Sequence, residues 1–130
     1  VYGEKMPTDS AYSAAIAIFL KQKREGIPLT VFGGEQSRDF TYIGDVVQAN
    51  ILAMDSPKVG KGEVINIGGG KEYKIIDVAK VISDEIEYLP QRMGEPMRTL
   101  ADISKAKKLL GWEPTVDLME WLKTHGGRND

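Results

Sequence analysis

The stretch that decides the fold is Val31-Phe32-Gly33-Gly34-Glu35-Gln36-Ser37-Arg38-Asp39-Phe40-Thr41-Tyr42-Ile43-Gly44-Asp45-Val46-Val47. A short apolar strand, predicted over residues 29–32, ends in a glycine turn and leads to a second extended segment, residues 38–43. An amphipathic helix capped by Asp45 follows and ends before Pro57. We expect the apolar residues of this helix to form one buried face: Val46, Val47, Ala49, Ile51, Leu52 and Met54. Two strands followed by a helix indicate a mixed α/β layer.

The same alternation continues on both sides of this stretch. Before it, Thr8 or Asp9 is predicted to cap a helix that runs to Arg24. After it we predict a strand over 63–67, a helix over 75–82 and a strand over 86–89. The junction between these last two is shorter than a normal connection, so we expect an early helix end or missing residues there. Further helices are predicted over residues 102–110, capped by Asp102 and ended by Gly111, and over residues 118–123.

These elements predict the α/β class, as one small mixed α/β domain covering residues 1–130. The domain is too small to be a complete doubly wound sheet with its own cofactor crevice. The 130 residues include 42% hydrophobic and 28% charged ones, which are ordinary globular values.

Composition also excludes several functions. The formal net charge is −2, which gives no general attraction to nucleic acid or to an anionic membrane. The chain has no cysteine and a single histidine, His125, so thiolate chemistry, a histidine-based triad and a histidine-rich metal site are excluded. No apolar run reaches the length of about 20 residues that a membrane helix needs. The chain opens on Val1 with no basic leader, so we expect a fragment of a longer protein and a cytoplasmic location.

Arginines supply the candidate binding groups. Arg38 follows the glycine turn, and its simplest role is a surface ion pair with Asp39. Arg92 lies in a loop bounded by Pro and Gly, with Arg98 close behind it. Two guanidinium groups suit the oxygens of a diphosphate, because each presents donors in a planar fork. A solvated loop in which Arg92 pairs with Glu95 is an equally good interpretation.

A glycine-rich turn, Gly68-Gly69-Gly70, follows the strand predicted over residues 63–67. Its spacing fits neither the phosphate-binding loop of nucleotidases nor the dinucleotide-binding motif, so a tight turn is the favoured interpretation. Asn66, just before it, is a candidate buried amide that would need both donor and acceptor partners.

Taken together, these segments resemble the extended short-chain dehydrogenase/reductase family. Residues 31–47 resemble its F-G-D-G-x-Q-x-R-D-F-x-Y-V-x-D-V stretch, and residues 63–68 its V-Y-N-I-G strand. Residues 89–95 resemble its L-P-x-R-x-G-D loop, residues 102–114 its D-x-S-K-A-x-x-x-L-G-W-x-P signature, and residues 1–3 the end of N-V-Y-G. The order and spacing agree across nearly the whole chain, and the nearest match is to the UDP-glucose 4-epimerases and their UDP-sugar relatives.

The resemblance implies an architecture of two domains. An N-terminal Rossmann domain would bind NAD and carry a Tyr-x-x-x-Lys pair, and a C-terminal domain would close over the nucleotide sugar. This chain has neither the glycine-rich NAD motif nor a tyrosine four residues before a lysine. It therefore resembles the substrate domain alone, with no catalytic residue of its own. Its partners would be a UDP-sugar, the Rossmann domain and, in a homodimer, a second copy.

Carried over motif by motif, Arg38 and Arg92 would hold the diphosphate, and Thr30 and Phe32 would line the uridine pocket. Glu95 stands where the family has Asp and would accept hydrogen bonds from ribose hydroxyls. In the complete enzyme, NAD would oxidise the sugar at C4 and return the hydride to the other face. Two alternatives stay open: a nucleotide-sugar 4,6-dehydratase or decarboxylase, and a folded fragment that binds no ligand.

Overall fold

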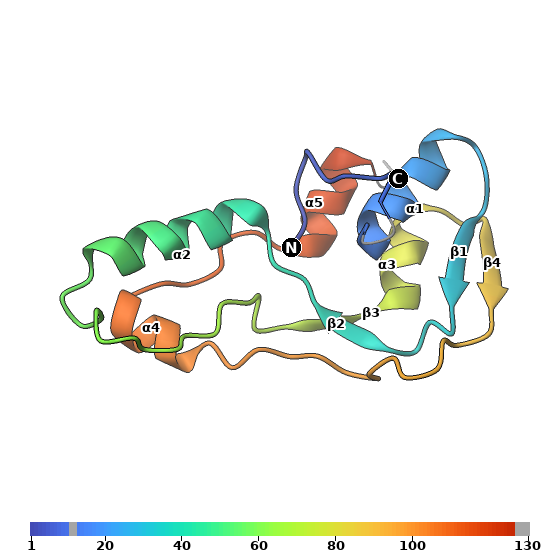
Figure 1. Cartoon of the computed structure of the whole chain (residues 1–130). Helices are drawn as coiled ribbons and strands as arrows, with labels where there is room; N and C mark the ends of the chain where they lie inside the picture. The colour runs from blue at the N-terminus through green and yellow to red at the C-terminus, as the bar shows by residue number, and fades with distance from the viewer. Residues whose placement is uncertain (11–12, 127–130) are drawn as a thin grey trace.

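The computed structural model describes residues 1–10 and 13–126 and has a mixed α/β architecture (Figure 1). The order of the elements is α1 (Ala15–Arg24), β1 (Leu29–Phe32), β2 (Ser37–Asp39), α2 (Ile43–Asp55), β3 (Glu72–Lys74), α3 (Ile75–Ile82), β4 (Ile86–Leu89), α4 (Ser104–Leu110) and α5 (Leu118–His125). Within these described ranges, no helix is long and apolar enough to cross a membrane.

Two small sheets organise the chain. β1 and β4 pair in parallel, with Leu29 opposite Ile86 and Phe32 opposite Leu89. β2 and β3 pair in antiparallel fashion. Because β3 runs directly into α3, and α3 leads to β4, the two sheets share one helix and are held close to each other (Figure 1).

The free edge of β1 is closed by two glutamine side chains. Gln22, on α1, accepts a hydrogen bond from the Thr30 backbone N–H at 3.1 Å and donates to the Thr30 hydroxyl at 3.0 Å. Gln36 donates to the Phe32 carbonyl at 2.6 Å. These contacts satisfy main-chain groups that would otherwise form an open strand edge.

The buried apolar residues form two separate clusters. The larger joins α1, α3, α5 and β1, and its largest fully buried members include Tyr2, Ile16, Leu29 and Ile82. The smaller lies between α2 and α4 and consists of Ala49, Ile103, Ala106, Leu110 and Trp112. In Figure 1 the α2 and α4 helices extend to one side of the molecule, away from the other three helices.

Asp45 links the two clusters, and this corrects its predicted role as a helix cap. It lies in the first turn of α2 with 4% of its surface exposed, but its carboxylate binds elsewhere. It accepts hydrogen bonds from the Thr115 hydroxyl at 2.6 Å and from the Thr115 N–H at 2.9 Å. Trp112 Nε1 donates to the Asp45 carbonyl at 2.9 Å. The linker between α4 and α5 is thereby fastened to the start of α2.

Several predicted elements are confirmed, and others are wrong. The strands at 29–32 and 86–89 and the helix at 75–82 have the predicted bounds. The first helix begins at Ala15, and no side chain caps it, so neither Thr8 nor Asp9 is its cap. Residues 11 and 12 of the predicted helix lie outside the described residues. The short junction needs no missing residues, because Ser83 Oγ accepts the Glu85 N–H at 3.1 Å and turns the chain within three residues.

Two errors concern the region around α2. The helix spans Ile43–Asp55, but only Asp45 and Ala49 are buried in it. Three residues of the predicted buried face are exposed: Val47 by 50%, Ile51 by 46% and Met54 by 83%. The strand predicted over 63–67 is absent, because no other described segment pairs with it.

Candidate functional site

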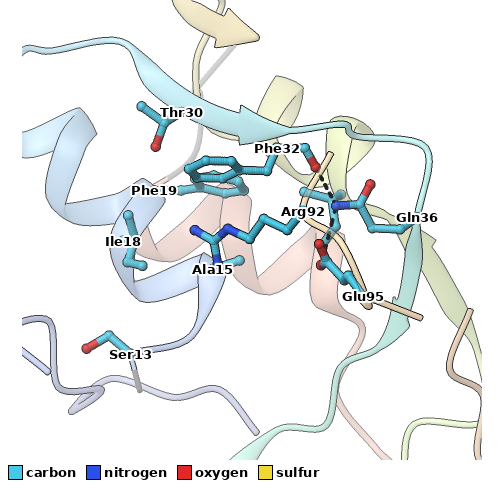
Figure 2. A pocket seen from close by; sticks show the side chains of 10 residues that line it. Ser13, Ala15, Ile18, Phe19, Thr30, Phe32, Gln36, Arg92 and Glu95 are labelled. Atoms are coloured by element: carbon cyan, nitrogen blue, oxygen red, sulfur yellow. Dashed lines mark hydrogen bonds between the residues drawn. The ribbon is translucent and has the colours of Figure 1, made fainter. Parts of the chain in front are cut away.

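A pocket opens between α1, β1, the start of α3 and the loop that follows β4. Its volume is about 200 Å³. Figure 2 shows its lining side chains, which are Ser13, Ala15, Ile18, Phe19, Thr30, Phe32, Gln36, Ile75, Arg92 and Glu95. Apolar side chains form one wall, and the polar groups come from Ser13 before α1, from β1, from Gln36 and from the loop.

Phe32 and Arg92 face each other in this pocket. The Arg92 guanidinium carbon lies 3.9 Å from the centre of the Phe32 ring (Figure 2). This contact is a cation–π interaction, in which the positive group lies against the electron-rich face of the ring. The contact holds the solvent-exposed Arg92 side chain at the pocket, while the N–H donors of the guanidinium remain available to an anion.

Glu95 connects the pocket to Arg38. Its Oε1 accepts a hydrogen bond from Arg38 Nη2 at 2.9 Å and a longer one from Gln36 Nε2 at 3.5 Å. Its Oε2 is buried and has no hydrogen-bond partner within the described chain. A buried carboxylate oxygen without a donor is costly, so this atom is suited to accept a hydrogen bond from a ligand.

The structure brings all five predicted binding residues into one region. Thr30, Phe32, Arg92 and Glu95 line the pocket, whereas Arg38 lies behind Glu95 and reaches the pocket only through it.

Both predicted surface ion pairs are wrong. Arg38 pairs with Glu95 and not with Asp39, and Arg92 stacks on Phe32 instead of pairing with Glu95. Arg98 does not converge with Arg92, since it pairs with Glu72 at 2.7 Å. Hydrogen bonds from Arg98 and Ser37 lower the pKa of the Glu72 carboxyl.

Gln36 and Ser13 are polar pocket residues that sequence reasoning missed, and Gln36 has the clearer role. Its side-chain oxygen accepts the Gly34 N–H at 2.7 Å, and its amide nitrogen binds the Phe32 carbonyl at 2.6 Å. Gln36 therefore fixes the glycine turn that shapes this end of the pocket. The available signal was its position in the Q-x-R-D part of the motif, where a glutamine follows a tight turn.

The glycine-rich turn at 68–70 holds an internal carboxylate. Asp39 accepts hydrogen bonds from the Gly69 N–H at 2.7 Å, the Gly70 N–H at 3.0 Å and the Ala101 N–H at 3.1 Å. A Cβ on Gly69 would lie 2.8 Å from Asp39 Oδ1, so glycine is needed there for the close approach. These donors are occupied by an acidic side chain, so the turn does not fit the pyrophosphate of a dinucleotide. It is a tight turn, as favoured from the sequence, while Asn66 is exposed and not a buried amide.

Comparison with known proteins identifies the family. The sequence profile of the NAD dependent epimerase/dehydratase family matches residues 1–68. An uncharacterised UDP-glucose epimerase of Bacillus subtilis (strain 168), YtcB, is 40% identical over 129 residues, which are 94% of this chain and 39% of that protein. UDP-glucuronic acid decarboxylase 2 of Arabidopsis thaliana is 34% identical over 93% of this chain and 28% of its own length. The chain belongs to the NAD-dependent epimerase/dehydratase family.

Solved structures agree with this assignment. UDP-glucose 4-epimerase of Thermotoga maritima, solved with UDP-glucose, superposes with a TM-score of 0.82 at 38% identity, over 94% of this chain and 40% of that one. UDP-glucuronic acid 4-epimerase of Bacillus cereus, solved with UDP-glucuronic acid and NAD, gives a TM-score of 0.82 at 40% identity, over 95% of this chain and 40% of that one. The chain therefore spans about 40% of the length of these epimerases.

Proposed function

We propose that residues 1–130 are the C-terminal, nucleotide-sugar-binding domain of an NAD-dependent UDP-glucose 4-epimerase, which interconverts UDP-glucose and UDP-galactose. The observation that carries the proposal is the pocket in which the Arg92 guanidinium lies over Phe32 beside an unpartnered Glu95 oxygen. An aromatic face, a cation and a carboxylate acceptor match the base, the phosphate and the ribose hydroxyls of a nucleotide. A cavity of about 200 Å³ is smaller than a typical whole-ligand site, and it suits one part of a nucleotide, such as the base with its ribose.

Each proposed binding residue has one task. Thr30 and Phe32 line the uridine pocket, Arg92 binds the diphosphate, and Glu95 accepts ribose hydroxyl hydrogen bonds through Oε2. Arg38 is proposed as the second diphosphate ligand, and its present bond to Glu95 keeps its guanidinium within one side chain of the pocket. Binding energy from these remote contacts would position the sugar for a reaction that this chain does not itself perform.

The rest of the enzyme is part of the same proposal. NAD would be held by an N-terminal Rossmann domain, because the glycine-rich turn at residues 68–70 of this chain is filled by Asp39. A cytoplasmic location and a homodimer complete the proposed assembly.

A second candidate keeps the domain but changes the reaction. Relatives of 34% identity are UDP-glucuronic acid decarboxylases. The contacts proposed above are all made to the nucleotide and none to the sugar. A decarboxylase or 4,6-dehydratase would therefore use the same five residues. Incubating the full-length enzyme with UDP-glucose or UDP-glucuronic acid and identifying the products separates these reactions.

Calorimetric titration of UDP and UDP-glucose tests the binding site. We expect both to bind, and we expect Arg92→Ala to weaken UDP by about 10- to 100-fold, as for a lost hydrogen bond to a charged group. Arg38→Ala should weaken UDP as well. Arg98→Ala is the matched control, because it removes the same charge from a side chain that pairs with Glu72 outside the pocket. The affinity of this variant for UDP should stay within about twofold of wild type.

Two results would reject the proposal. The first is no heat with either ligand, in the chain or in the full-length enzyme, which would favour a folded fragment without a ligand. The second is an unchanged UDP affinity in both Arg38→Ala and Arg92→Ala.

A further inference from the structure

Gln36 places a buried amide between two walls of the nucleotide pocket. The residue is 3% exposed, and it lines the pocket. Burying an amide costs free energy unless its donors and its acceptor are hydrogen-bonded. The partners of this side chain therefore show what it holds in place.

One wall is the end of β1 and the glycine turn after it. Gln36 Oε1 accepts the Gly34 N–H at 2.7 Å, and Nε2 donates to the Phe32 carbonyl at 2.6 Å. The main chain of the turn is also bonded to the start of α3, because the Gly34 and Gln36 carbonyls accept the N–H groups of Ile76 and Ile75 at 3.0 and 2.9 Å. Phe32 is thereby fixed relative to both the turn and α3.

The other wall is the loop that follows β4. Gln36 Nε2 also lies 3.5 Å from Glu95 Oε1, at the long end of the hydrogen-bond range. Arg38 Nη2 donates to the same oxygen at 2.9 Å. With both donors directed at Oε1, Oε2 is the oxygen of Glu95 that has no partner within the described chain. Figure 2 shows the Gln36 amide between Phe32 and Glu95, with a hydrogen bond to each.

We propose, on the basis of the proposed function, that Gln36 is a positioning residue that couples these two walls. It holds Phe32 in place for the base and, through Glu95, makes the site select nucleotides that carry ribose hydroxyls. A neutral amide suits both walls at once, because it offers an acceptor to Gly34 and one donor each to Phe32 and Glu95. A carboxylate in its place would have no N–H donor and would repel Glu95.

Two ligands that differ only in the ribose test the selection. The full-length enzyme is titrated calorimetrically with UDP and with 2′,3′-dideoxy-UDP, which has the same base and diphosphate but no ribose hydroxyl. The hydroxyl preference is the ratio of the two dissociation constants. We expect wild type to prefer UDP by about 10-fold or more, as for a hydrogen bond to a charged group. Gln36→Met, which has a similar length and no amide, should reduce this preference to within about threefold.

Gln36→Glu adds a pH readout that the loss of a structural contact does not give. At pH 8 the new carboxylate should be ionised, repel Glu95 and compete with it for Arg38, so the hydroxyl preference is lost. Towards about pH 5.5 a protonated carboxyl can again donate to the Phe32 carbonyl while it accepts the Gly34 N–H, so the preference should return. Wild type at the same pH values accounts for the titration of UDP and of Glu95.

The other charged side chains near position 36 are paired with each other. Glu35, the preceding residue, accepts a hydrogen bond from Lys74 at the start of α3, at 2.9 Å. Both are exposed, so solvent screens their influence on a group at position 36.

Gln22→Glu is the matched control. Gln22 is the other glutamine at the β1 edge; it hydrogen-bonds Thr30 and does not line the pocket. The variant carries the same chemical change, and its hydroxyl preference should stay within about twofold of wild type at each pH, even where UDP itself binds more weakly. An equal loss of preference in Gln22→Glu and Gln36→Glu would overturn the proposal, since any disturbance of β1 would then suffice.

A double-mutant cycle tests whether Gln36 acts through Glu95. Glu95→Gln should itself remove the hydroxyl preference. Adding Gln36→Met to Glu95→Gln should then change the preference by less than about twofold, because the two residues share one task. Losses that multiply independently would contradict this coupling.

One measurement needs no variant. In nuclear magnetic resonance spectra of the wild-type chain, the side-chain amide protons of Gln36 should exchange with solvent at least about 10-fold more slowly than those of the exposed Gln48. Equal exchange would overturn the proposal even if both Gln36 variants failed to fold.

The outcomes separate this role from the pocket itself. Wild type that prefers UDP, with the same preference in Gln36→Met and Gln36→Glu, would reject the role of Gln36 and leave the nucleotide site standing. Wild type that binds UDP and dideoxy-UDP equally would also reject the selection. Wild type that binds neither ligand would reject the proposed function, and the role of Gln36 with it.

Discussion

Among single side chains, Asp117 joins two elements at the edge of the larger cluster. Its Oδ2 accepts the Glu120 N–H at 3.1 Å and so caps the start of α5, while its Oδ1 accepts the Tyr73 hydroxyl at 2.8 Å. Burial alone would raise the pKa of the Asp117 carboxyl. The hydrogen bonds from Tyr73 and Glu120 outweigh that effect and leave the pKa below its ordinary value. The ionised form is therefore the one that the fold stabilises.

Replacing Asp117 should make a pH-dependent difference to stability. The pKa is lower in the folded than in the unfolded chain, so the contribution of Asp117 is complete above its unfolded pKa of about 3.9. It is lost as the pH falls through the lower folded value. We expect Asp117→Ala to reduce the free energy of unfolding by about 1–2 kcal/mol at pH 7, as for a lost helix cap. Urea denaturation at pH 7 and at pH 3 should show the gap between variant and wild type narrowing at the lower pH; a constant gap would contradict this role.

Residue-scale features of the site were predictable where they are local. The strand that carries Thr30 and Phe32 follows from its apolar residues and the glycine turn after it, whereas the binding role of these two residues was implied only by the family resemblance. Arg92 follows from a loop bounded by Pro and Gly. The Arg38–Glu95 pair was not predictable from spacing, because 57 residues separate the two partners. The sequence offered Asp39 as the adjacent acid, but the Gly69 and Gly70 N–H groups bind that carboxylate instead.

At the scale of elements, the end of α4 is set by one glycine. Gly111 has φ of 64° in the left-handed region, and its N–H bonds back to the Lys107 carbonyl. A Cβ built on Gly111 would meet no atom within 4 Å. Any cost of a side chain at this position is therefore conformational and does not come from a steric clash.

Gly111→Ala should lower the free energy of unfolding by about 1 kcal/mol, because alanine disfavours a positive φ. Gly111→Asn should cost less, since asparagine tolerates the left-handed region better than other side chains. Chemical denaturation of the two variants and wild type provides the measurement. Equal losses for alanine and asparagine would mean that another property of the position decides its stability.

Elements with one clear apolar face could be predicted, and those that need a partner could not. The α3 helix has a single buried face and was predicted with its observed bounds. The α2 helix has apolar residues on two faces, and periodicity alone does not say which face this chain buries. Residues 63–67 have strand composition, but a strand exists only when another strand pairs with it. The start of α1 was misplaced because a possible capping residue does not by itself begin a helix.

At the scale of the whole molecule, the two apolar clusters differ in how well they are supported. The larger buries 14 described residues, which are Tyr2 and 13 residues of α1, α3, α5 and β1, whereas the smaller buries five, between α2 and α4. α2 also exposes the apolar residues Val47, Ile51 and Met54, and residues 63–67 have no strand partner in the described chain. Few buried contacts and open main-chain groups are the features that lower the free energy of local opening.

We therefore expect the α2–α4 side of the isolated chain to open before the rest. In native-state hydrogen exchange, the slowest amides of α2 and α4 should exchange at least about 10-fold faster than those of α3, whose core residues Val78, Ala79 and Ile82 are fully buried. Asp45 connects the two sides, because its carboxylate accepts hydrogen bonds from Thr115 in the linker before α5. Asp45→Asn weakens these hydrogen bonds and should speed amide exchange in α2 and α4 while changing exchange in α3 little. If the amides of all three helices exchange at one common rate in wild type, the two clusters unfold as a single cooperative unit. The proposed difference in the free energy of local opening between the two sides is then wrong.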